Sequence, residues 1–383
     1  MITWRSGTVV ETGKTWGMGP SGARELVVSL DAPLPGRTNP TEKALAYTAL
    51  VGDPKVGDSL LLNCSALARG LGTGGYALVA APGAENLPLD PEPGPGHLVK
   101  ARYTPLQAMV MGADEQESPF HQLLAEADDL DAMPVVVADL HSAVPAIIAG
   151  ARYAAALAGA PEPSVAYVMT DGGALPVAFS QTAARLRDAG WIDSVITVGQ
   201  AFGGDHEAVT AHTGLLTAKL VTKADLTIVA QGPGNLGTGT RWGFSGVAAG
   251  EAVNAAAALR GSPVASLRMS GADARDRHVG VSHHSLTAYG RVAMTRCDVP
   301  VPVPMPSVEG LTGWGRELTV KMRSQVRELS IKHRLVDVPV GPELVDALAD
   351  APVRLSTMGR GLDADPSAFV AAAAAGVHAM NML

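Results

Sequence analysis

Side chains that could transfer protons or bind a metal follow the apolar runs in the middle of the chain. Asp139 and His141 come directly after the run 134–138. On an extended backbone, residues two apart point the same way, so this pair could serve as acid and base or share a metal ion. The alternative is a helix start, in which Asp139 or Ser142 caps the helix and His141 is an ordinary buried histidine.

Acidic residues also follow two further apolar runs. Asp171 comes after the run 165–169, and Asp205 and His206 come shortly after the run 194–198. We expect Asp205 and His206 to open a helix, where the helix dipole stabilises a carboxylate whatever its function. Their position after predicted strands makes all three residues candidates for acid–base chemistry.

The adjacent histidines His283 and His284 are harder to explain as packing residues. Neighbouring helical residues point about 100° apart, so the two rings cannot both face one core. They follow a polar stretch that includes His278, and polar loops of this kind often carry function. We expect at least one of the pair to be catalytic. A divalent metal ion held by Asp139, His141 and His283 is a variant of this hypothesis.

A glycine-rich segment follows the fourth apolar run, 226–230. Its spacing Gly232-x-Gly234-x-x-Gly237 matches the letters of the dinucleotide fingerprint, but a second polar stretch precedes the next helix and no acidic residue ends the next strand. We therefore do not expect bound NAD. The segment could offer amides, hydroxyls and a guanidinium to a small anion, or its glycines could simply serve positive φ. The candidate ligand-binding residues are Gly232, Gly234, Gly237, Thr238, Gly239, Thr240, Arg241 and, after the next strand, Arg268.

The elements that must position these residues form an α/β domain. Continuous β-branched runs separated by segments of helical period predict a mainly parallel, doubly wound sheet covered on both faces. In such a sheet, ligands bind beyond the carboxyl ends of the strands. The predicted strands are 134–138, 165–169, 194–198, 226–230 and 264–267. We expect one cavity at their carboxyl ends, lined by Asp139, His141, Asp171, His206 and at least one of His283 and His284.

The first part of the chain is organised differently. Five short stretches with β-strand character are separated by turn signals and not by helices, which predicts a small barrel. Residues 82–96 contain five prolines and would link this barrel to the rest of the chain. We place the domains at 1–98 and 99–383. The stretches are 8–11, 25–30, 44–50, 59–62 and 76–80.

Three later segments complete the α/β domain. Residues 299–304 alternate valine with proline, which is typical of an edge strand or an extended crossing because proline cannot donate a ladder hydrogen bond. Residues 316–334 place apolar side chains on one helical face and predict a basic, amphipathic helix. The alanine-rich stretch 368–375 predicts a helix packed on the protein.

Composition narrows the classes of partner. The formal net charge of −8 disfavours nucleic acid and anionic lipid. The N-terminus lacks an export signal, no apolar stretch approaches the roughly 20 residues that cross a bilayer, and the distant pair Cys64 and Cys297 offers no disulfide framework. We therefore expect a cytoplasmic protein that binds neither nucleic acid nor membrane. With 47% apolar and 17% charged residues, we also expect a homo-oligomer, most simply a two-fold dimer.

Three strings of the chain resemble an uncharacterised actinobacterial family that is known only as a domain of unknown function. They lie at 170–176, 232–240 and 277–285. The resemblance covers most of the chain. It implies no activity, cofactor or catalytic residue, because the family carries none that could be transferred.

Two classes of function remain open. The leading hypothesis is an enzyme that acts on a small anionic metabolite by histidine and aspartate acid–base chemistry, with an optional divalent metal and an otherwise unknown cofactor. The alternative is a non-catalytic ligand-binding or assembly protein. An enzyme should gather two or more titratable groups around one cavity, whereas a binding protein needs only complementary hydrogen bonds.

Overall fold

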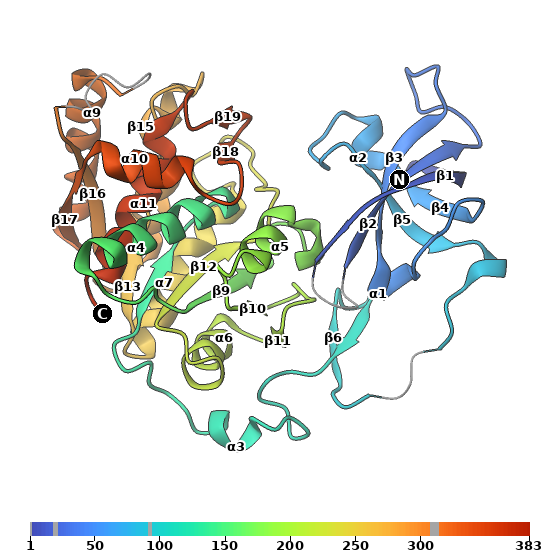
Figure 1. Ribbon diagram of the computed structural model, residues 1–383, viewed down its shortest axis with the longest axis horizontal. Helices are drawn as coiled ribbons and strands as arrows, with labels where there is room; N and C mark the ends of the chain where they lie inside the picture. The colour runs from blue at the N-terminus through green and yellow to red at the C-terminus, as the bar shows by residue number, and fades with distance from the viewer. Residues whose placement is uncertain (1, 18–21, 91–93, 307–313) are drawn as a thin grey trace. The chain divides into compact units, whose positions relative to one another are not determined.

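The computed structural model describes residues 2–17, 22–90, 94–306 and 314–383 (Figure 1). The chain forms two compact units. The first comprises residues 1–110 and 176–184, and the second comprises residues 111–175 and 185–383. The boundary therefore falls at Val110, and a short segment between two strands of the second unit belongs to the first. Of the five prolines in the 82–96 segment, Pro91 and Pro93 lie outside the described residues.

The first unit is the predicted barrel. Five strands close it in the order β1-β2-β3-β5-β4, with β3 and β5 parallel and the other neighbours antiparallel. This is the strand order of an OB-fold barrel. Alternate side chains point inward, so Leu26 and Val28 of one strand meet Leu60 and Leu62 of another in the core. The strands are β1 (Trp4–Trp16), β2 (Ala23–Leu30), β3 (Thr41–Tyr47), β4 (Ser59–Asn63) and β5 (Ala77–Pro82).

Shorter elements accompany the barrel. They are the helices α1 (Thr48–Val51) and α2 (Ser65–Ala68), a 3₁₀ turn at Ala84–Asn86, and a hairpin of β6 (Leu98–Lys100) and β7 (Ala108–Val110). The 3₁₀ turn Val177–Phe179 also belongs to this unit.

The second unit is built on a parallel sheet of eight strands in the order β11-β10-β9-β12-β8-β13-β16-β17. The five predicted apolar runs became β8, β9, β10, β12 and β13; the first four agree within one residue at each end, and β13 begins and ends two residues earlier than predicted. Each is buried on both faces, as a strand covered by two layers of helices must be. The bounds are β8 (Pro134–Val137), β9 (Val165–Thr170), β10 (Ser194–Thr197), β11 (His206–Glu207), β12 (Leu226–Gln231), β13 (Ser262–Ala265), β16 (Asp298–Pro304) and β17 (Arg334–Val340).

The chain reverses its direction across this sheet at β8. From β8 it runs outward to β9, β10 and β11, and from β12 it passes β8 to reach β13, β16 and β17. Right-handed crossovers running in opposite directions put their helices on opposite faces of the sheet. Helix α4 (Val144–Ala158), which leaves β8, and helix α7 (Ala249–Ala258), which leaves β12, therefore cover different faces. Such a switch point is where open α/β sheets bind ligands.

Helix α11 (Pro366–Met380) lies along α4 and covers the same face. The two helices touch through small residues. A Cβ added to Gly376 would stand 1.8 Å from the carbonyl oxygen of Ile147, and one added to Gly150 would stand 2.0 Å from that of Ala373. Backbone contact of this closeness fixes α11 against the helix that follows β8, and it therefore fixes the start of α11 near the switch point.

The remaining elements of the second unit are short or peripheral. They are α3 (His121–Leu124), the 3₁₀ turn His141–Ala143, α5 (Gln181–Asp188, across the unit boundary), α6 (Ala211–Leu216) with a π turn at Thr217–Val221, the 3₁₀ turn Ser245–Ala248, β14 (Met269–Ser270), the 3₁₀ turn Asp276–His278, β15 (Gly280–Val281), α8 (His283–Thr287) with a π turn at Ala288–Val292, α9 (Arg316–Val326), the 3₁₀ turn Leu329–Ile331, α10 (Pro342–Ala349), β18 (Ser356–Thr357) and β19 (Arg360–Gly361). Among the described residues, no helix has the length and apolar character needed to cross a membrane.

The prediction of an edge strand at 299–304 is wrong. Strand β16 lies inside the sheet, between β13 and β17, and pairs with β17 along its whole length. Its prolines occupy alternate positions, so the missing N–H groups all fall on one side of the strand while the valines keep theirs for the other side. The amphipathic helix is confirmed as α9, with Leu318, Met322 and Val326 buried, but it ends at Val326 and β17 begins at Arg334.

Candidate functional site

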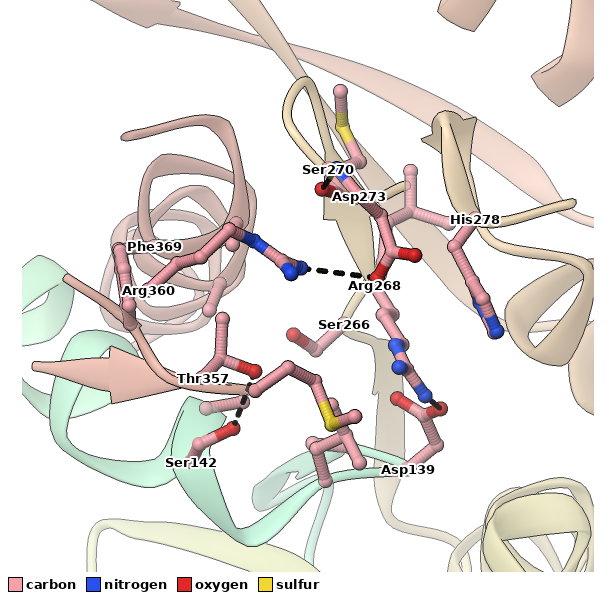
Figure 2. A pocket seen from close by; sticks show the side chains of 18 residues that line it. Asp139, Ser142, Ser266, Arg268, Ser270, Asp273, His278, Thr357, Arg360 and Phe369 are labelled. Atoms are coloured by element: carbon pink, nitrogen blue, oxygen red, sulfur yellow. Dashed lines mark hydrogen bonds and ion pairs between the residues drawn. The ribbon is translucent and has the colours of Figure 1, made fainter. Parts of the chain in front are cut away.

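A small cavity opens at the carboxyl ends of β8 and β13, at the switch point of the sheet (Figure 2). Its volume is about 30 Å³, room for two or three water molecules or for one small charged group. The hydroxyl of Tyr289 lies 2.8 Å from the Val137 carbonyl and 3.1 Å from the Ser266 carbonyl, which holds the two strand ends together. The polar walls come from Asp139, Ser142, Ser266, Arg268, Asp273, His278 and Arg360.

Asp139 and Arg268 line one wall of this cavity, and His284 lies next to both of them behind that wall. The Arg268 Nη1 donates to Nδ1 of His284 at 2.9 Å and lies 3.7 Å from Oδ2 of Asp139. A guanidinium can only donate, so Nδ1 of His284 accepts and this ring carries its proton on Nε2. Oδ2 of Asp139 lies 3.4 Å from the same Nδ1, is buried and has no hydrogen bond. A buried carboxylate oxygen that makes no hydrogen bond can take up a proton from a ligand or accept a hydrogen bond from it.

The opposite wall is a frame of carboxylates and arginines. Arg360 donates to Asp273 at 3.0 Å and to Asp365 at 3.1 Å, and Asp273 also receives two side-chain bonds from Arg275 at 2.9 Å. The bonds from Arg275, and to a smaller extent the bond from Arg360, hold the pKa of Asp273 well below its usual range. Asp365 is fully buried at the start of α11. The frame is therefore charged and rigid, and it joins β14, β19 and α11 around the cavity.

Only the C-terminal end of the glycine-rich segment, at Phe244 and Gly246, reaches this site. A Cβ on Gly246 would stand 2.8 Å from the Asp139 carbonyl oxygen, so only glycine lets the segment pass this close. Phe244 stacks flat on the imidazole of His284, with ring centroids 3.7 Å apart. Gln231, at the end of β12, donates to the Asp139 carbonyl at 2.9 Å. The segment thus positions two of the site residues from outside.

The earlier part of the segment has structural roles. Gly232 passes close to the loop after β9, where an added Cβ would stand 2.5 Å from the Ala174 carbonyl oxygen, and Gly234 and Gly239 have positive φ. Thr238 and Thr240 hydrogen-bond to each other and to Gly243 within the loop. Gly237 and Arg241 are exposed and line none of the cavities described here. Of the eight predicted ligand-binding residues, only Arg268 lines the cavity.

The structure does not support the predicted facing pair of Asp139 and His141, because the His141 ring contacts Tyr167 whereas the Asp139 carboxylate lies beside Arg268 and His284. The His141 ring is buried against Tyr167 of β9, with Nδ1 2.9 Å from the tyrosine hydroxyl. The chain turns into a 3₁₀ helix at His141, which ends the extended geometry that would have aligned the two side chains. Burial lowers the pKa of His141 to about 4.

Substitution of His141 by Gln should flatten the acid side of the stability profile. The unfolded chain takes up a proton near pH 6.5, whereas the folded protein keeps the His141 ring neutral down to about pH 4. Stability is therefore full above pH 6.5 and falls between pH 6.5 and 4, by about 2 kcal/mol at pH 4.5 through this residue. Urea unfolding at pH 7 and 4.5 should show a smaller loss in His141→Gln. The exposed His212→Gln serves as control, and equal losses in both variants would contradict the assignment.

Asp171, Asp205 and His206 lie elsewhere on the sheet. Oδ2 of Asp171 accepts the Gln200 amide at 2.8 Å and ties the loop after β9 to the loop after β10. Asp205 accepts the Val195 amide at 2.8 Å and pairs with Arg187. His206 does not open a helix but starts β11, which three strands separate from β8. The helix begins later, at Ala211. The single cavity predicted for all these residues is therefore wrong.

The structure gathers His283 and His284 with a third histidine, His278. Among the described residues, these three form the one group of three or more side chains with ligand atoms close enough to hold a metal ion. The predicted set of Asp139, His141 and His283 is not such a group. Burial, followed by neighbouring positive charge, lowers the pKa of His278 to about 3. Burial likewise lowers the pKa of His283 to about 4. Both rings are neutral at pH 7.

Sequence reasoning missed several residues of the site. His278 and Asp273 stood in the polar stretch before His283, but their spacing carried no known motif. Arg360 and Asp365 come from the C-terminal part of the chain, where no signal marked them. Phe244 follows the glycine-rich segment, where only the glycines, hydroxyls and Arg241 were considered.

No curated protein has a sequence that matches this chain. The family described as "Protein of unknown function (DUF3866)" matches residues 43–376, which takes in the barrel from within β3 onward and nearly all of the α/β unit with the cavity. A match of this extent settles membership, and the chain belongs to the DUF3866 family of proteins of unknown function.

Proposed function

We propose that this protein is an enzyme that acts on a small anionic compound at the cavity beyond β8 and β13. The observation that carries the proposal is the meeting of Asp139, Arg268 and His284 at the switch point of the sheet. Arg268 binds the anionic group, because a guanidinium pairs with carboxylate or phosphate through two parallel donors. Asp139 exchanges the proton, since its Oδ2 is buried, without a hydrogen bond and next to that cation.

His284 positions the other two side chains in this proposal. Its Nδ1 holds the guanidinium of Arg268 beside the carboxylate of Asp139, and Phe244 fixes the plane of its ring. The size of the cavity supports recognition of one charged group of the substrate, with the rest of the compound extending outward.

Conversion of a candidate compound is the direct test of this proposal. Wild-type protein is incubated with a mixture of phosphorylated and carboxylated metabolites, and ¹H and ³¹P NMR spectra report which compounds change. Asp139→Asn keeps the shape of the side chain but removes its ability to take up a proton, so conversion should fall by about a hundredfold or more. Asp171→Asn, also placed after a parallel strand, should convert at the wild-type rate. Absence of any conversion by wild-type protein would contradict the enzymatic proposal and favour the non-catalytic alternative.

We propose the cytoplasm as the compartment and a two-fold homodimer as the assembly. Both cysteines are free and buried, which suits a reducing compartment. Large apolar side chains such as Leu157 and Ile331 are exposed on the second unit and would gain from an isologous interface. A light-scattering mass of 39.2 kDa, that of one chain, would contradict the dimer.

A further inference from the structure

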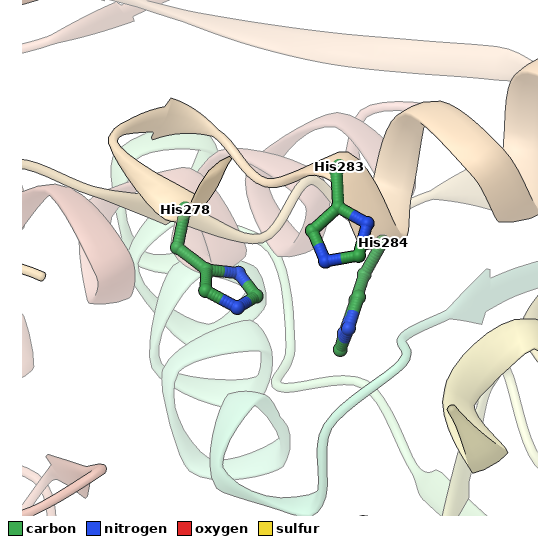
Figure 3. A group of neighbouring side chains, drawn as sticks. All are labelled: His278, His283 and His284. Carbon is green, nitrogen blue, oxygen red and sulfur yellow. The ribbon is translucent and has the colours of Figure 1, made fainter. Parts of the chain in front are cut away.

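We infer that His278, His283 and His284 form a binding site for a divalent transition metal ion of the zinc class. One nitrogen from each imidazole lies within 4.8 Å of the others, and Figure 3 shows the three rings turned toward one another below the loop that carries them. Three imidazoles with a remaining open position are the protein ligands of many catalytic zinc sites. This inference does not depend on the proposed reaction.

The hydrogen bonds around the three rings decide which nitrogen of each ring can bind a metal ion. His278 uses Nδ1 for the Ser282 hydroxyl, 2.7 Å away. His284 uses Nδ1 for Arg268. His283 has a buried Nε2 without any hydrogen-bond partner. In His278 Nε2 is the nitrogen left to bind an ion, while the bonded Nδ1 fixes the ring orientation, as outer contacts of metal-binding histidines usually do. Nε2 of His284 can bind an ion once its proton moves to Nδ1, which requires Arg268 to release Nδ1, and the carboxylate of Asp139, 3.4 Å away, is placed to accept the resulting Nδ1–H.

The local sequence explains why these rings converge. Strand β15 has only two residues, so His278 before it and His283 after it are close in the chain, and their ring centroids lie 5.0 Å apart. Ser282 caps helix α8 by accepting the His284 amide at 3.2 Å and at the same time contacts His278. The side chains of adjacent residues at a helix start point in different directions. The rings of His283 and His284 therefore border the same space from two sides, with their centroids 4.4 Å apart.

The energetics of the site favour an occupant. A buried ring nitrogen without a partner costs free energy that a bound ion would recover. Zinc–nitrogen bonds of about 2.0–2.1 Å place tetrahedral ligand atoms roughly 3.3 Å apart, and rotation about χ2 of His283, whose Nε2 has no hydrogen bond, can supply part of the approach. Arg268 opposes a cation here, and the carboxylate of Asp139, 3.4 Å from His284, offsets its charge. An all-imidazole set suits zinc, copper, nickel or iron and not magnesium or calcium.

Metal content and cobalt absorption of the full-length chain test this site. The metal-free protein is loaded with zinc, desalted and measured by elemental analysis, and in parallel it is titrated with cobalt(II) while the visible bands of the bound ion are recorded. Wild type should hold about one equivalent, and His283→Gln and His284→Gln should each fall below about 0.2 equivalents while keeping the wild-type circular dichroism spectrum. Two variants are used so that the site is still tested if one of them fails to fold.

Two matched histidine variants control this experiment. His212→Gln changes an exposed histidine, and His141→Gln changes a buried histidine that lies directly after β8. Both should bind zinc and cobalt as wild type does. Substoichiometric metal in wild type, or equal metal in wild type and His283→Gln, would overturn the assignment and leave the three rings as packing groups. Loss of metal in His141→Gln but not in His283→Gln would move the site to another set of ligands.

Discussion

Replacing Asp365 by Ala should lower the free energy of unfolding by about 3–5 kcal/mol, the usual result of removing one partner from a buried ionic group. Its carboxylate is fully buried and accepts four hydrogen bonds. The donors are the Ser270 hydroxyl at 2.5 Å, the Ser367 hydroxyl at 2.9 Å, the Gly271 amide at 3.0 Å and Nε of Arg360 at 3.1 Å. The substitution leaves these donors without an acceptor and Arg360 with Asp273 alone.

Urea unfolding followed by circular dichroism measures this effect. Asp363→Ala is the matched control, because Asp363 is exposed and stands two residues earlier in the chain. Exposed substitutions away from special features usually change stability by less than about 0.5 kcal/mol. The unfolding free energy of Asp365→Asn should lie between those of Asp365→Ala and Asp363→Ala, since the amide keeps the shape of the side chain and part of its hydrogen bonding. Similar unfolding free energies for Asp365→Ala and Asp363→Ala would show that the frame does not support the fold.

The sequence predicted most of the sheet because of one physical signal. Strands such as β8 and β12 are covered on both faces, so most residues along them are apolar and the run stands out from its neighbours. Strand β11 has only two residues at the edge of the sheet and carries no such signal. In β16 the alternation of proline suggested an edge, whereas pairing to β17 needs N–H groups on one side only.

The candidate site was predicted in part, for a related reason. Asp139 and Arg268 follow strands that are neighbours in the sheet, so the rule about carboxyl ends brings them together. Asp171 and His206 also follow or begin strands, but the order of the strands, which no local pattern reveals, places them away from β8. Arg360 and Asp365 reach the cavity because α11 packs on α4, and Asp365 meets Ser270 across 95 residues of sequence.

Loss of anion binding on substitution of Arg268 is the second large effect that we expect. Arg268 has a side chain only 11% exposed, lines the cavity and lies beside Asp139 and His284. Hydrogen bonds to charged groups contribute about 1.5–3 kcal/mol, so removing this cation should weaken the binding of orthophosphate or acetate by roughly 10- to 150-fold. Gln keeps most of the length of the side chain and a hydrogen-bond donor but removes the charge.

The measurement that tests the site most directly is calorimetric titration of the folded protein with orthophosphate and with acetate. It compares wild type with Arg268→Gln and with Arg241→Gln, which changes an exposed arginine of the glycine-rich segment. Thermal unfolding of each variant is recorded alongside. We predict saturable binding in wild type, an unchanged affinity in Arg241→Gln and a loss of more than about tenfold in Arg268→Gln, with every variant still folded at the temperature of the titration. Equal affinities in wild type and Arg268→Gln, or a loss confined to Arg241→Gln, would contradict a functional site at the carboxyl ends of β8 and β13.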